Sequence, residues 1–215
     1  AVGNPYGDGY YDDFNTAVGL DSAGRTQLHH KGKLVIGVEN TPTVIFDLMQ
    51  FLVIDLGGVV GQIGMGQHGT AFAHAGMRMG PAICYEGLYG DFYGDFVRRG
   101  AQFMAIISND GWWGDTPGYK HLFTISRLRA IEHRRAIARS ANTGMSGFIS
   151  ARGDIGETLG WEKRGVISAA VPLNSELTFY TRYGDYLGRI AEYLTLLCVL
   201  YYIAYRVKRE NYLVK

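Results

Sequence analysis

Short apolar runs separated by glycine-rich turns make up most of the chain. Two extended segments, Val18–Leu20 and Gln27–Val38, flank a polar turn at residues 21–25, which is typical of a β-hairpin. The segment Thr43–Leu56 is strongly apolar and ends at a glycine pair, so it predicts either a short helix or a loop packed on a nonpolar surface. Arg78–Tyr85 then predicts an apolar strand that ends at a cysteine.

The next part of the chain alternates helical and extended patterns. Asp91–Arg99 and His121–Arg139 place apolar residues at helical spacing, and the arginines of the second segment are expected to form a solvated face. Between these segments, Phe103–Ile107 is a continuous apolar run, typical of a strand buried on both faces of a sheet. Further strands are predicted at Ser146–Ser150 and Gly165–Val171. This order of elements indicates an α/β layered domain.

The C-terminal segment follows a different pattern. Leu187–Tyr205 is mostly apolar and is followed by a cluster of lysine and arginine. At a rise of about 1.5 Å per residue, such a helix is just long enough for a hydrocarbon layer of roughly 30 Å. We therefore expect a folded domain over residues 1–185, a transmembrane helix at 186–206 and a basic cytoplasmic tail at 207–215. The alternative is an amphipathic helix that packs on the domain or on another subunit.

Composition and charge narrow the class of protein. A hydrophobic fraction of 47% with 19% charged residues indicates an ordered, core-forming domain. Lysine and arginine (21) nearly balance aspartate and glutamate (20), so no overall field selects nucleic acid as a partner. The two cysteines, Cys84 and Cys198, lie in very different surroundings, which makes a disulfide improbable and leaves at least one free thiol. The histidines lack the spacing of metal ligands, so neither a metal nor a cofactor is expected.

Cys84 is the strongest candidate for chemistry. It ends the predicted strand and precedes a glycine-rich, aromatic segment, which is where a turn presenting a nucleophile would lie. Taken alone, a cysteine at a strand end is more often a small buried hydrophobic residue. The surrounding motifs decide between these two interpretations.

Several sequence blocks give this cysteine a specific context. They occur in order at His30–Glu39, Pro81–Glu86, Ile106–Gly114, His121–Glu132, Arg139–Gly144 and Thr178–Asp185. In order and spacing they closely resemble apolipoprotein N-acyltransferase, a membrane family of the nitrilase, or carbon-nitrogen hydrolase, superfamily. Cys-Tyr-Glu is shared with many nitrilase relatives, whereas the loop Ser-Asn-Asp-Gly-Trp-Trp-Gly and the terminal helix point to the membrane family. The resemblance implies a nitrilase-like α-β-β-α sandwich, partial here, followed by a C-terminal transmembrane helix.

The resemblance also implies roles for individual residues. The family has a Glu-Lys-Cys triad in which the cysteine is acylated, the lysine stabilises the oxyanion and the glutamate moves protons. Cys84 matches the nucleophile and Lys31 the lysine, although Lys33 would point the same way along a strand. A nearby ammonium would lower the pKa of the thiol and stabilise the negative oxygen of a tetrahedral intermediate. Three further residues match the rest of the family's site: Glu39, Tyr85 and Glu86.

Simpler roles stay open for these residues. Lys31 also fits an ordinary solvated lysine, Glu86 an ion-pair partner and Glu39 the cap of a turn. The residues of the tryptophan loop either shape the pocket or only fold the loop, so none is assigned a catalytic role. They are Asn109, Asp110, Trp112 and Trp113.

Two features depart from the family pattern. No residue ahead of Lys31 matches the triad glutamate, and no bundle of membrane helices precedes the domain. We therefore expect a C-terminal fragment of a longer protein, with the triad glutamate ahead of Ala1. Residues 1–215 alone are then expected to have little or no acyltransferase activity, because the general base is missing.

The function implied by the resemblance is a two-step acyl transfer. The Cys84 thiolate attacks a phospholipid ester, forms a thioester and releases a lysophospholipid, and the amine of an apolipoprotein's N-terminal lipidated cysteine then takes the acyl chain. Such an enzyme lies in the bacterial inner (cytoplasmic) membrane with its catalytic domain on the periplasmic side. Two alternatives are a soluble or peripheral nitrilase-superfamily amidohydrolase and a catalytically silent membrane-anchored module.

Overall fold

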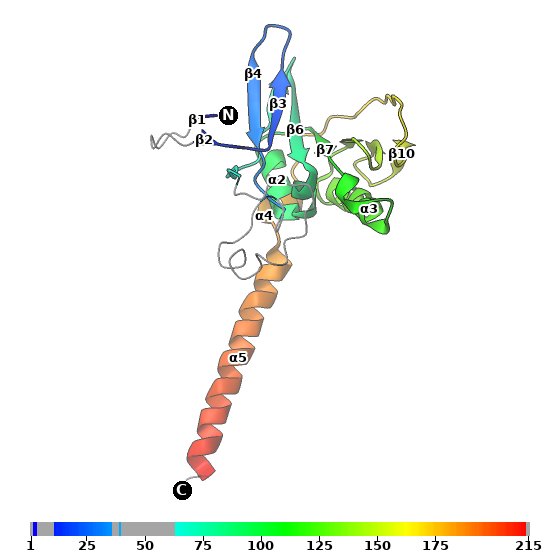
Figure 1. Cartoon of the computed structure of the whole chain (residues 1–215). Coiled ribbons are helices and arrows are strands. Elements are labelled where there is room, and N and C mark those ends of the chain that lie inside the picture. The colour runs from blue at the N-terminus through cyan, green and yellow to red at the C-terminus, as the bar shows by residue number, and fades with distance from the viewer. Residues whose placement is uncertain (1, 4–10, 36–38, 40–62, 214–215) are drawn as a thin grey trace.

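A six-stranded mixed sheet with the order β10-β9-β8-β7-β6-β5 forms the centre of the protein (Figure 1). The computed structural model describes residues 2–3, 11–35, 39 and 63–213. The strands are β5 (Phe72–His74), β6 (Met77–Ile83), β7 (Phe103–Ser108), β8 (Ile137–Ala141), β9 (Ser146–Ile149) and β10 (Ile155–Leu159). β6, β7 and β8 are parallel, and the outer strands pair in antiparallel fashion. The carboxyl ends of the three parallel strands therefore meet at one edge of the sheet.

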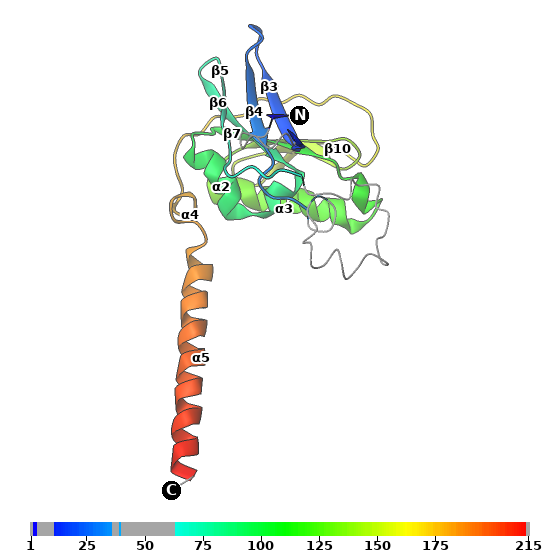
Figure 2. The same ribbon diagram turned by 60° about the vertical axis from the view of Figure 1, so that its left-hand side comes forward.

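Helices α2 (Gly90–Arg98) and α3 (Pro117–His133) cover one face of this sheet (Figure 2). The core between them consists of fully or almost fully buried apolar side chains, among them Phe96, Met104 and Ile106. Because side chains alternate along a strand, Ile107 of β7 points away from this core and is 49% exposed. Each fully buried large apolar side chain contributes roughly 1.5–3 kcal/mol, so this layer provides much of the stability of the domain.

A hairpin of β3 (Thr16–Leu20) and β4 (Thr26–His30) lies on the opposite face of the sheet. Ala17 of β3 packs with Phe72 and Ile83 in a second, smaller apolar cluster. The approach is close, because a Cβ on Gly19 would lie 2.8 Å from the Phe72 ring. The hairpin confirms the turn predicted at residues 21–25, although β4 is shorter than expected and ends at His30. A second two-stranded pair joins β1 (Val2–Gly3) to β2 (Tyr11–Asp12).

The helix predicted over His121–Arg139 is wrong at both ends. It begins at Pro117, because Thr116 caps it by accepting a hydrogen bond from Gly118 N, and it stops where Arg134 adopts a left-handed φ of 51°. The following residues form β8, whose β-branched Ile137 is fully buried at the centre of the sheet. The apolar period of the helix continued by chance into the strand and concealed the boundary.

The expectation that the arginines of this segment form a solvated face holds only for Arg127 and Arg134, which are exposed. The other three are buried, and the guanidinium of each donates hydrogen bonds to carbonyl groups or a carboxylate. They are Arg129, Arg135 and Arg139. Arg135 donates to Ala101 O at 2.7 Å and Glu176 O at 2.9 Å, which ties the end of α3 to two other segments. Because hydrogen-bonded charges are the ones that burial tolerates, these arginines are structural.

Other sequence-based expectations have mixed outcomes. No strand forms at Gly165–Val171, which runs as an exposed segment without regular structure, and the antiparallel neighbour of β9 is β10 instead. The apolar segment Thr43–Leu56 lies outside the described residues. Gly100 follows α2 with a φ of 100°, in the left-handed range that a glycine adopts most easily after the end of a helix.

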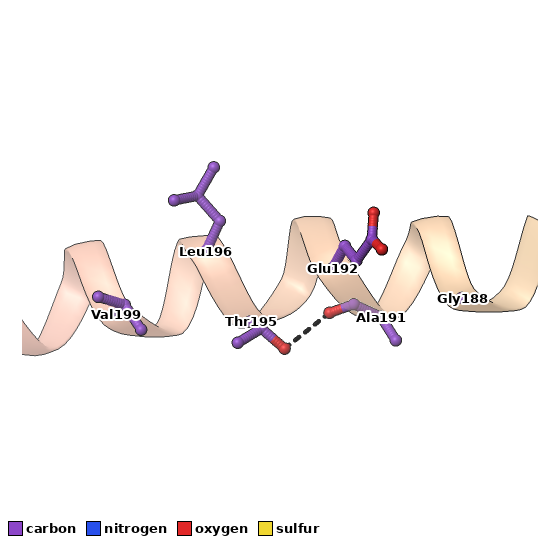
Figure 3. A pocket seen from close by; sticks show the side chains of 6 residues that line it. All are labelled: Gly188, Ala191, Glu192, Thr195, Leu196 and Val199. Carbon is purple, nitrogen blue, oxygen red and sulfur yellow. Dashed lines mark hydrogen bonds between the residues drawn. The ribbon is translucent and has the colours of Figure 1, made fainter. Parts of the chain in front are cut away.

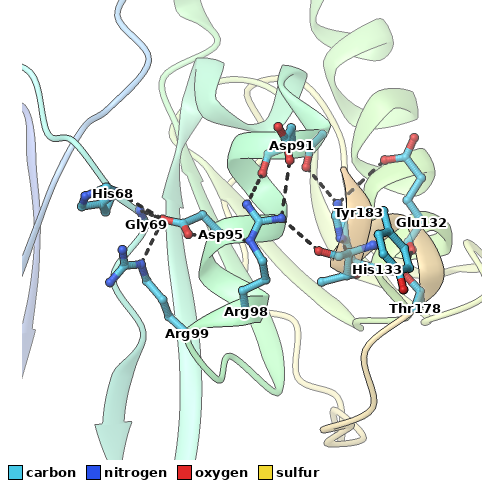
Figure 4. Close-up of polar contacts among 12 residues, drawn as sticks. His68, Gly69, Asp91, Asp95, Arg98, Arg99, Glu132, His133, Thr178 and Tyr183 are labelled. Atoms are coloured by element: carbon cyan, nitrogen blue, oxygen red, sulfur yellow. Dashed lines mark hydrogen bonds and ion pairs between the residues drawn. The ribbon is translucent and has the colours of Figure 1, made fainter. Parts of the chain in front are cut away.

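The short helix α4 (Phe179–Tyr183) packs on α2 and α3 through buried polar contacts (Figure 4). His133 of α3 bonds Thr181 Oγ1 at 2.9 Å through Nδ1 and Gly90 O at 3.0 Å through Nε2. Because a carbonyl only accepts, Nε2 carries the proton and Nδ1 accepts from the Thr181 hydroxyl. Burial, reinforced by the nearby Arg129, lowers the pKa of His133 to about 3. The contact therefore requires a neutral imidazole.

Helix α5 (Tyr186–Leu213) leaves the domain directly after α4. Its segment Tyr186–Arg206 has 21 residues and a mean hydropathy of 1.4, and none of its most apolar window is buried against the rest of the chain. This segment is long and apolar enough to cross a membrane, as expected. Figure 3 shows one face of it, which combines small side chains with a single carboxylate. The face is lined by Gly188, Ala191, Glu192, Thr195, Leu196 and Val199.

Candidate active site

Cys84 lies at a sharp turn between a strand and a helix. It follows Ile83, the last residue of β6, and begins the 3₁₀ helix η1 (Cys84–Leu88) with a left-handed φ of 46°. A residue with a Cβ pays roughly 1–2 kcal/mol for this conformation. The thiol is half-buried at the carboxyl edge of the parallel strands and packs against the small apolar cluster beneath the hairpin. Such a turn presents a side chain outward at the end of a rigid strand.

Glu86 joins this turn to the segment that follows β4. Its carboxylate is fully buried and accepts hydrogen bonds from the amides of Ile83 and Gly32, both at 2.6 Å. His29 Nε2 lies 3.1 Å from each of its oxygens. Since Gly32 directly follows Lys31, one side chain fixes the cysteine turn and the lysine segment to each other. The structure thus brings together the two regions that the sequence motifs single out.

Lys31 and Glu39 form a buried ion pair. The lysine side chain is 2% exposed, and its Nζ donates to both carboxylate oxygens of Glu39 at 2.8 Å. The amide of Val35 at 2.8 Å and Asn15 Nδ2 at 3.0 Å also donate to this carboxylate. Burial acts to raise the pKa of Glu39, but the bonds from Lys31, Val35 and Asn15 outweigh burial and leave the pKa lowered. Glu39 is therefore ionised at neutral pH and holds the lysine in place.

Lys33 points to a different environment from Lys31. Its Nζ lies 5.3 Å from the ring centres of both Tyr89 and Phe92, in the geometry of a cation–π contact. The expectation that both lysines point the same way along a strand is wrong, because β4 ends at His30 and the chain bends over the next residues. The bend passes close to α2, since a Cβ on Gly32 would lie 2.4 Å from the Phe92 ring. The structure favours Lys31 as the buried cation.

The neighbouring strand ends carry a second buried ion pair. Arg139 Nη2 of β8 lies 2.8 and 3.0 Å from the two oxygens of Asp110, which follows β7. Ser108 Oγ donates to the same carboxylate at 2.5 Å, and both members of the pair are almost fully buried. The pair holds the start of the loop in which Trp112 and Trp113 are about half exposed. Asp110 therefore folds this loop, one of the two roles left open for it.

Two contributors to the site are not evident from the sequence. His29 contacts Glu86, and Asn15 contacts Glu39, but neither residue belongs to a motif or a periodic pattern that distinguishes it. Their roles depend on the hairpin pairing that places β3 and β4 beside the turn at Cys84. Within the described ranges, no group of three His, Cys, Asp or Glu side chains is arranged to hold a metal ion.

Comparison with known proteins identifies the family. Residues 2–177 match the family model described as carbon-nitrogen hydrolase. The chain belongs to the carbon-nitrogen hydrolase family. Two similar members are both named apolipoprotein N-acyltransferase. The protein from Chlorobaculum tepidum is 36% identical over 181 residues, which cover 81% of this chain and 34% of that protein. The protein from Verminephrobacter eiseniae is 34% identical over 178 residues, covering 79% of this chain and 32% of that protein. This carbon-nitrogen hydrolase chain thus spans about a third of the length of these relatives.

Solved structures support the expected fold of this carbon-nitrogen hydrolase. Saccharomyces cerevisiae Nit3, a member of the nitrilase superfamily, superimposes with a TM-score of 0.52. The match covers 70% of this chain and 51% of Nit3, at 18% sequence identity. The fold class predicted from the sequence, a partial nitrilase-like sandwich followed by an apolar helix, is confirmed.

Proposed function

We propose that this chain is the nitrilase-type catalytic part of an apolipoprotein N-acyltransferase, with Cys84 as nucleophile and Lys31 as its cation. The observation that carries the proposal is the Glu86 carboxylate, which fixes the strained Cys84 turn beside the segment of the buried Lys31. The names of the relatives support the choice of reaction. The nitrilase superfamily also includes amidases. The experiments must therefore identify the acyl acceptor.

In the first step the Cys84 thiolate attacks the carbonyl carbon of a phospholipid ester. A C–S bond forms, the carbonyl oxygen becomes an oxyanion beside Lys31, and the C–O bond then breaks to release a lysophospholipid whose alkoxide takes a proton. Lys31 suits the oxyanion role because it is buried and already held in place, so little reorganisation accompanies the reaction. Tyr85 directly follows the nucleophile and packs edge to face on Tyr89.

In the second step the amine of an apolipoprotein's lipidated N-terminal cysteine attacks the thioester. The C–S bond breaks, Cys84 leaves as a thiolate and the amine loses a proton to a base. Glu39 and Glu86 are poorly suited as that base, because each carboxylate is already occupied by several donors. We assign them supporting roles and assign proton transfer to another group. Residues 1–215 alone are therefore expected to form the acyl adduct on Cys84 but to pass the acyl chain to the amine slowly.

The direction of the strands supports a site on the side of the domain that faces the membrane. In Figure 1 the arrowheads of β4 and β6 point to the end of the domain from which α5 departs, and Lys31 and Cys84 directly follow these two strands in the sequence. We propose that residues 186–206 span the inner membrane, that 1–185 form the periplasmic catalytic domain and that 207–215 are cytoplasmic. A site facing the bilayer gives both lipid substrates direct access.

The test is acylation of a single cysteine. The chain, purified in maltoside micelles, is incubated with phospholipid or with an activated fatty acyl ester, and its intact mass is measured. We expect one acyl adduct that is absent in Cys84→Ala and present in Cys198→Ala, the matched control for the other free thiol. An adduct on Cys198 alone, or none from either donor, contradicts the proposal.

The acceptor is tested by adding a diacylglyceryl-cysteine peptide with a free α-amine to the acylated protein. Appearance of the acyl chain on the peptide amine supports acyl transfer. Discharge to free fatty acid alone, at the same rate with and without peptide, would instead indicate a hydrolase. No adduct and no change of any kind in Cys84→Ala would indicate a silent membrane-anchored module.

A further inference from the structure

A short series of contacts runs from Lys33 to the turn at Cys84. Lys33 lies over the ring of Tyr89, and Tyr89 packs against Tyr85, which directly follows Cys84. We propose that these three side chains form a phosphate-binding site that holds the phosphodiester group of the phospholipid donor. The inference rests on the proposed function for the identity of the donor and adds to it the residue that would recognise the headgroup. The shared chemistry is a phosphate anion, and the lipid is the source to which we commit.

Lys33 supplies a cation that is held in position by aromatic rings. It contacts the faces of Tyr89 and Phe92 at 5.3 Å, and within the described part of the chain it forms no ion pair. Contact with two rings restricts the lysine side chain, so less conformational entropy is lost when an anion binds. Lys31, in contrast, already donates to both oxygens of Glu39. Of these two lysines, only Lys33 has no carboxylate partner among the residues that the structure describes.

The tyrosines supply hydroxyl donors that connect Lys33 to the nucleophile. Their rings meet edge to face with centres 5.4 Å apart, and Tyr85 directly follows Cys84. A side-chain interaction with Tyr85 that favours the protonated phenol, with a smaller effect of burial, raises the pKa of Tyr89 to about 12. The Tyr89 hydroxyl therefore keeps its proton at physiological pH. Tyr89 is 37% exposed, so a ligand from solvent or membrane reaches it.

The contacts that separate Lys33 from the nucleophile turn suit a phospholipid better than a small acyl ester. In a phospholipid the phosphate is separated from the scissile ester by the few bonds of the glycerol backbone. A cation that recognises it must lie near the nucleophile without contacting the reacting carbonyl. Lys33 meets this condition through two intervening tyrosines, while the buried Lys31 remains available for the oxyanion. The two lysines would thus divide phosphate binding and oxyanion stabilisation between them.

The simpler interpretation is that Lys33 only packs on aromatic rings. Lys120 provides a matched control for that interpretation, because its Nζ lies 5.6 Å from the ring centre of Tyr119 on α3. If the role of Lys33 is packing alone, substitutions at the two lysines should have the same consequences for ligand binding. If Lys33 binds phosphate, only its substitution should discriminate charged from uncharged lipids.

The experiment compares ligands that differ in the phosphate group. Calorimetry in maltoside micelles measures binding of dihexanoylphosphatidylglycerol, dihexanoylglycerol and inorganic phosphate to the full chain and to Lys33→Gln, Lys33→Arg and Lys120→Gln. We expect Lys33→Gln to weaken phosphatidylglycerol binding at least about tenfold, the usual scale of a charge-assisted hydrogen bond. Lys33→Arg and Lys120→Gln should bind it nearly as the unsubstituted chain does, and dihexanoylglycerol should not distinguish the variants.

Three outcomes would overturn the inference. These are equal phosphatidylglycerol affinity with and without Lys33, equal loss of charged and uncharged lipid, and Lys33-dependent binding of inorganic phosphate without any effect on phosphatidylglycerol. The last result would assign the site to free phosphate. Because Cys84→Ala should still bind the lipid, the measurement is independent of acyl transfer. Lipid binding without any thioester would refute the proposed function alone, and a thioester without Lys33-dependent binding would refute this inference alone.

Discussion

The amide nitrogen of Gly32 lies 2.6 Å from Oε1 of the buried Glu86. This bond connects two segments more than fifty residues apart, one containing Lys31 and the other Cys84. A hydrogen bond from an amide to a buried carboxylate is stronger than one to a neutral acceptor, because the charge is poorly screened away from water. The relative position of the proposed nucleophile and cation therefore depends on Glu86 more than on either reactive residue.

Replacing Glu86 with Gln should weaken both the fold and the site. Gln removes the charge, and its NH2 group faces one of the two backbone N–H donors, so at least one buried hydrogen-bonding group loses its partner at a cost of about 1–3 kcal/mol. Urea unfolding measures this loss, and iodoacetamide labelling reports whether Cys84 changes in reactivity. Glu157→Gln, on the exposed strand β10, is the control. Equal stability of the two variants would show that Glu86 does not organise the turn.

A methyl group at Gly32 should disrupt the same junction through space alone. An added Cβ would lie 2.4 Å from the Phe92 ring and 2.8 Å from Gly66 O, and the backbone oxygen cannot move aside easily. Overpacking of this kind typically costs about 1–3 kcal/mol, so Gly32→Ala should lower the unfolding midpoint. Gly160→Ala is the matched control, because no atom lies within 4 Å of the Cβ it would add. A tolerated Gly32→Ala would mean that the close approach of this segment to α2 is not required.

Much of the layered fold is predictable from the sequence, and the predictions that are wrong have physical causes. The apolar runs at β6 and β7 identify the central strands because strands buried on both faces lose the polar alternation. The boundary between α3 and β8 is not predictable from periodicity, since it depends on the left-handed turn at Arg134 and on the pairing of β8 with β7. An arginine in a helical pattern gives no sign of burial until the carbonyl groups around it are known, as Arg135 demonstrates.

Some residues of the candidate site are likewise predictable from the sequence, and others are not. Motif positions identify Cys84, Glu86, Lys31 and Glu39, and the structure places them in two connected clusters of hydrogen bonds. The distinction between Lys31 and Lys33 required the bend after His30, which no strand pattern contains. His29 and Asn15 became evident only through hairpin pairing, because a residue whose role is to orient another has no spacing of its own.

Removing the charge of Asp110 should be among the most destabilising single changes. Asp110→Asn leaves the buried guanidinium of Arg139 without its carboxylate, and an unpaired buried charge costs about 3–5 kcal/mol. Denaturant unfolding gives the magnitude, and tryptophan fluorescence reports any movement of the loop at Trp112. Asp154→Asn breaks a pair with Arg152 that is largely exposed, so it should cause no measurable change. Similar effects of the two substitutions would refute the structural importance of the buried pair.

Lys31→Met should slow acylation of Cys84 by an activated fatty acyl ester. The reason is that the substitution removes the cation that we propose stabilises the oxyanion of the tetrahedral intermediate. Intact-mass measurement of adduct formation over time tests this, in the Cys198→Ala background. Lys33→Met serves as the matched substitution and should leave the rate with this phosphate-free donor unchanged. Equal rates for the unsubstituted chain and Lys31→Met would show that Lys31 does not act on the reaction.

Stability should fall as the pH drops below the ordinary pKa of histidine, because of His133. Burial beside Arg129 holds its pKa at about 3, whereas in the unfolded chain it titrates near 6.5. Between these values the unfolded state binds a proton that the folded state does not, so the free energy of unfolding decreases by up to about 1.4 kcal/mol per pH unit. Glu132 opposes this trend because burial raises its pKa, but its effect belongs to lower pH, nearer the ordinary range of a carboxyl.

The free energy of unfolding measured with urea should therefore differ by about 1 kcal/mol between pH 7.0 and pH 5.5. In His133→Asn, which retains a donor and an acceptor for Gly90 and Thr181, the difference should shrink, while His74→Asn, at an exposed strand end, should keep it. An unchanged difference in His133→Asn would assign the pH dependence to other groups and would remove the requirement for a neutral imidazole beneath α4.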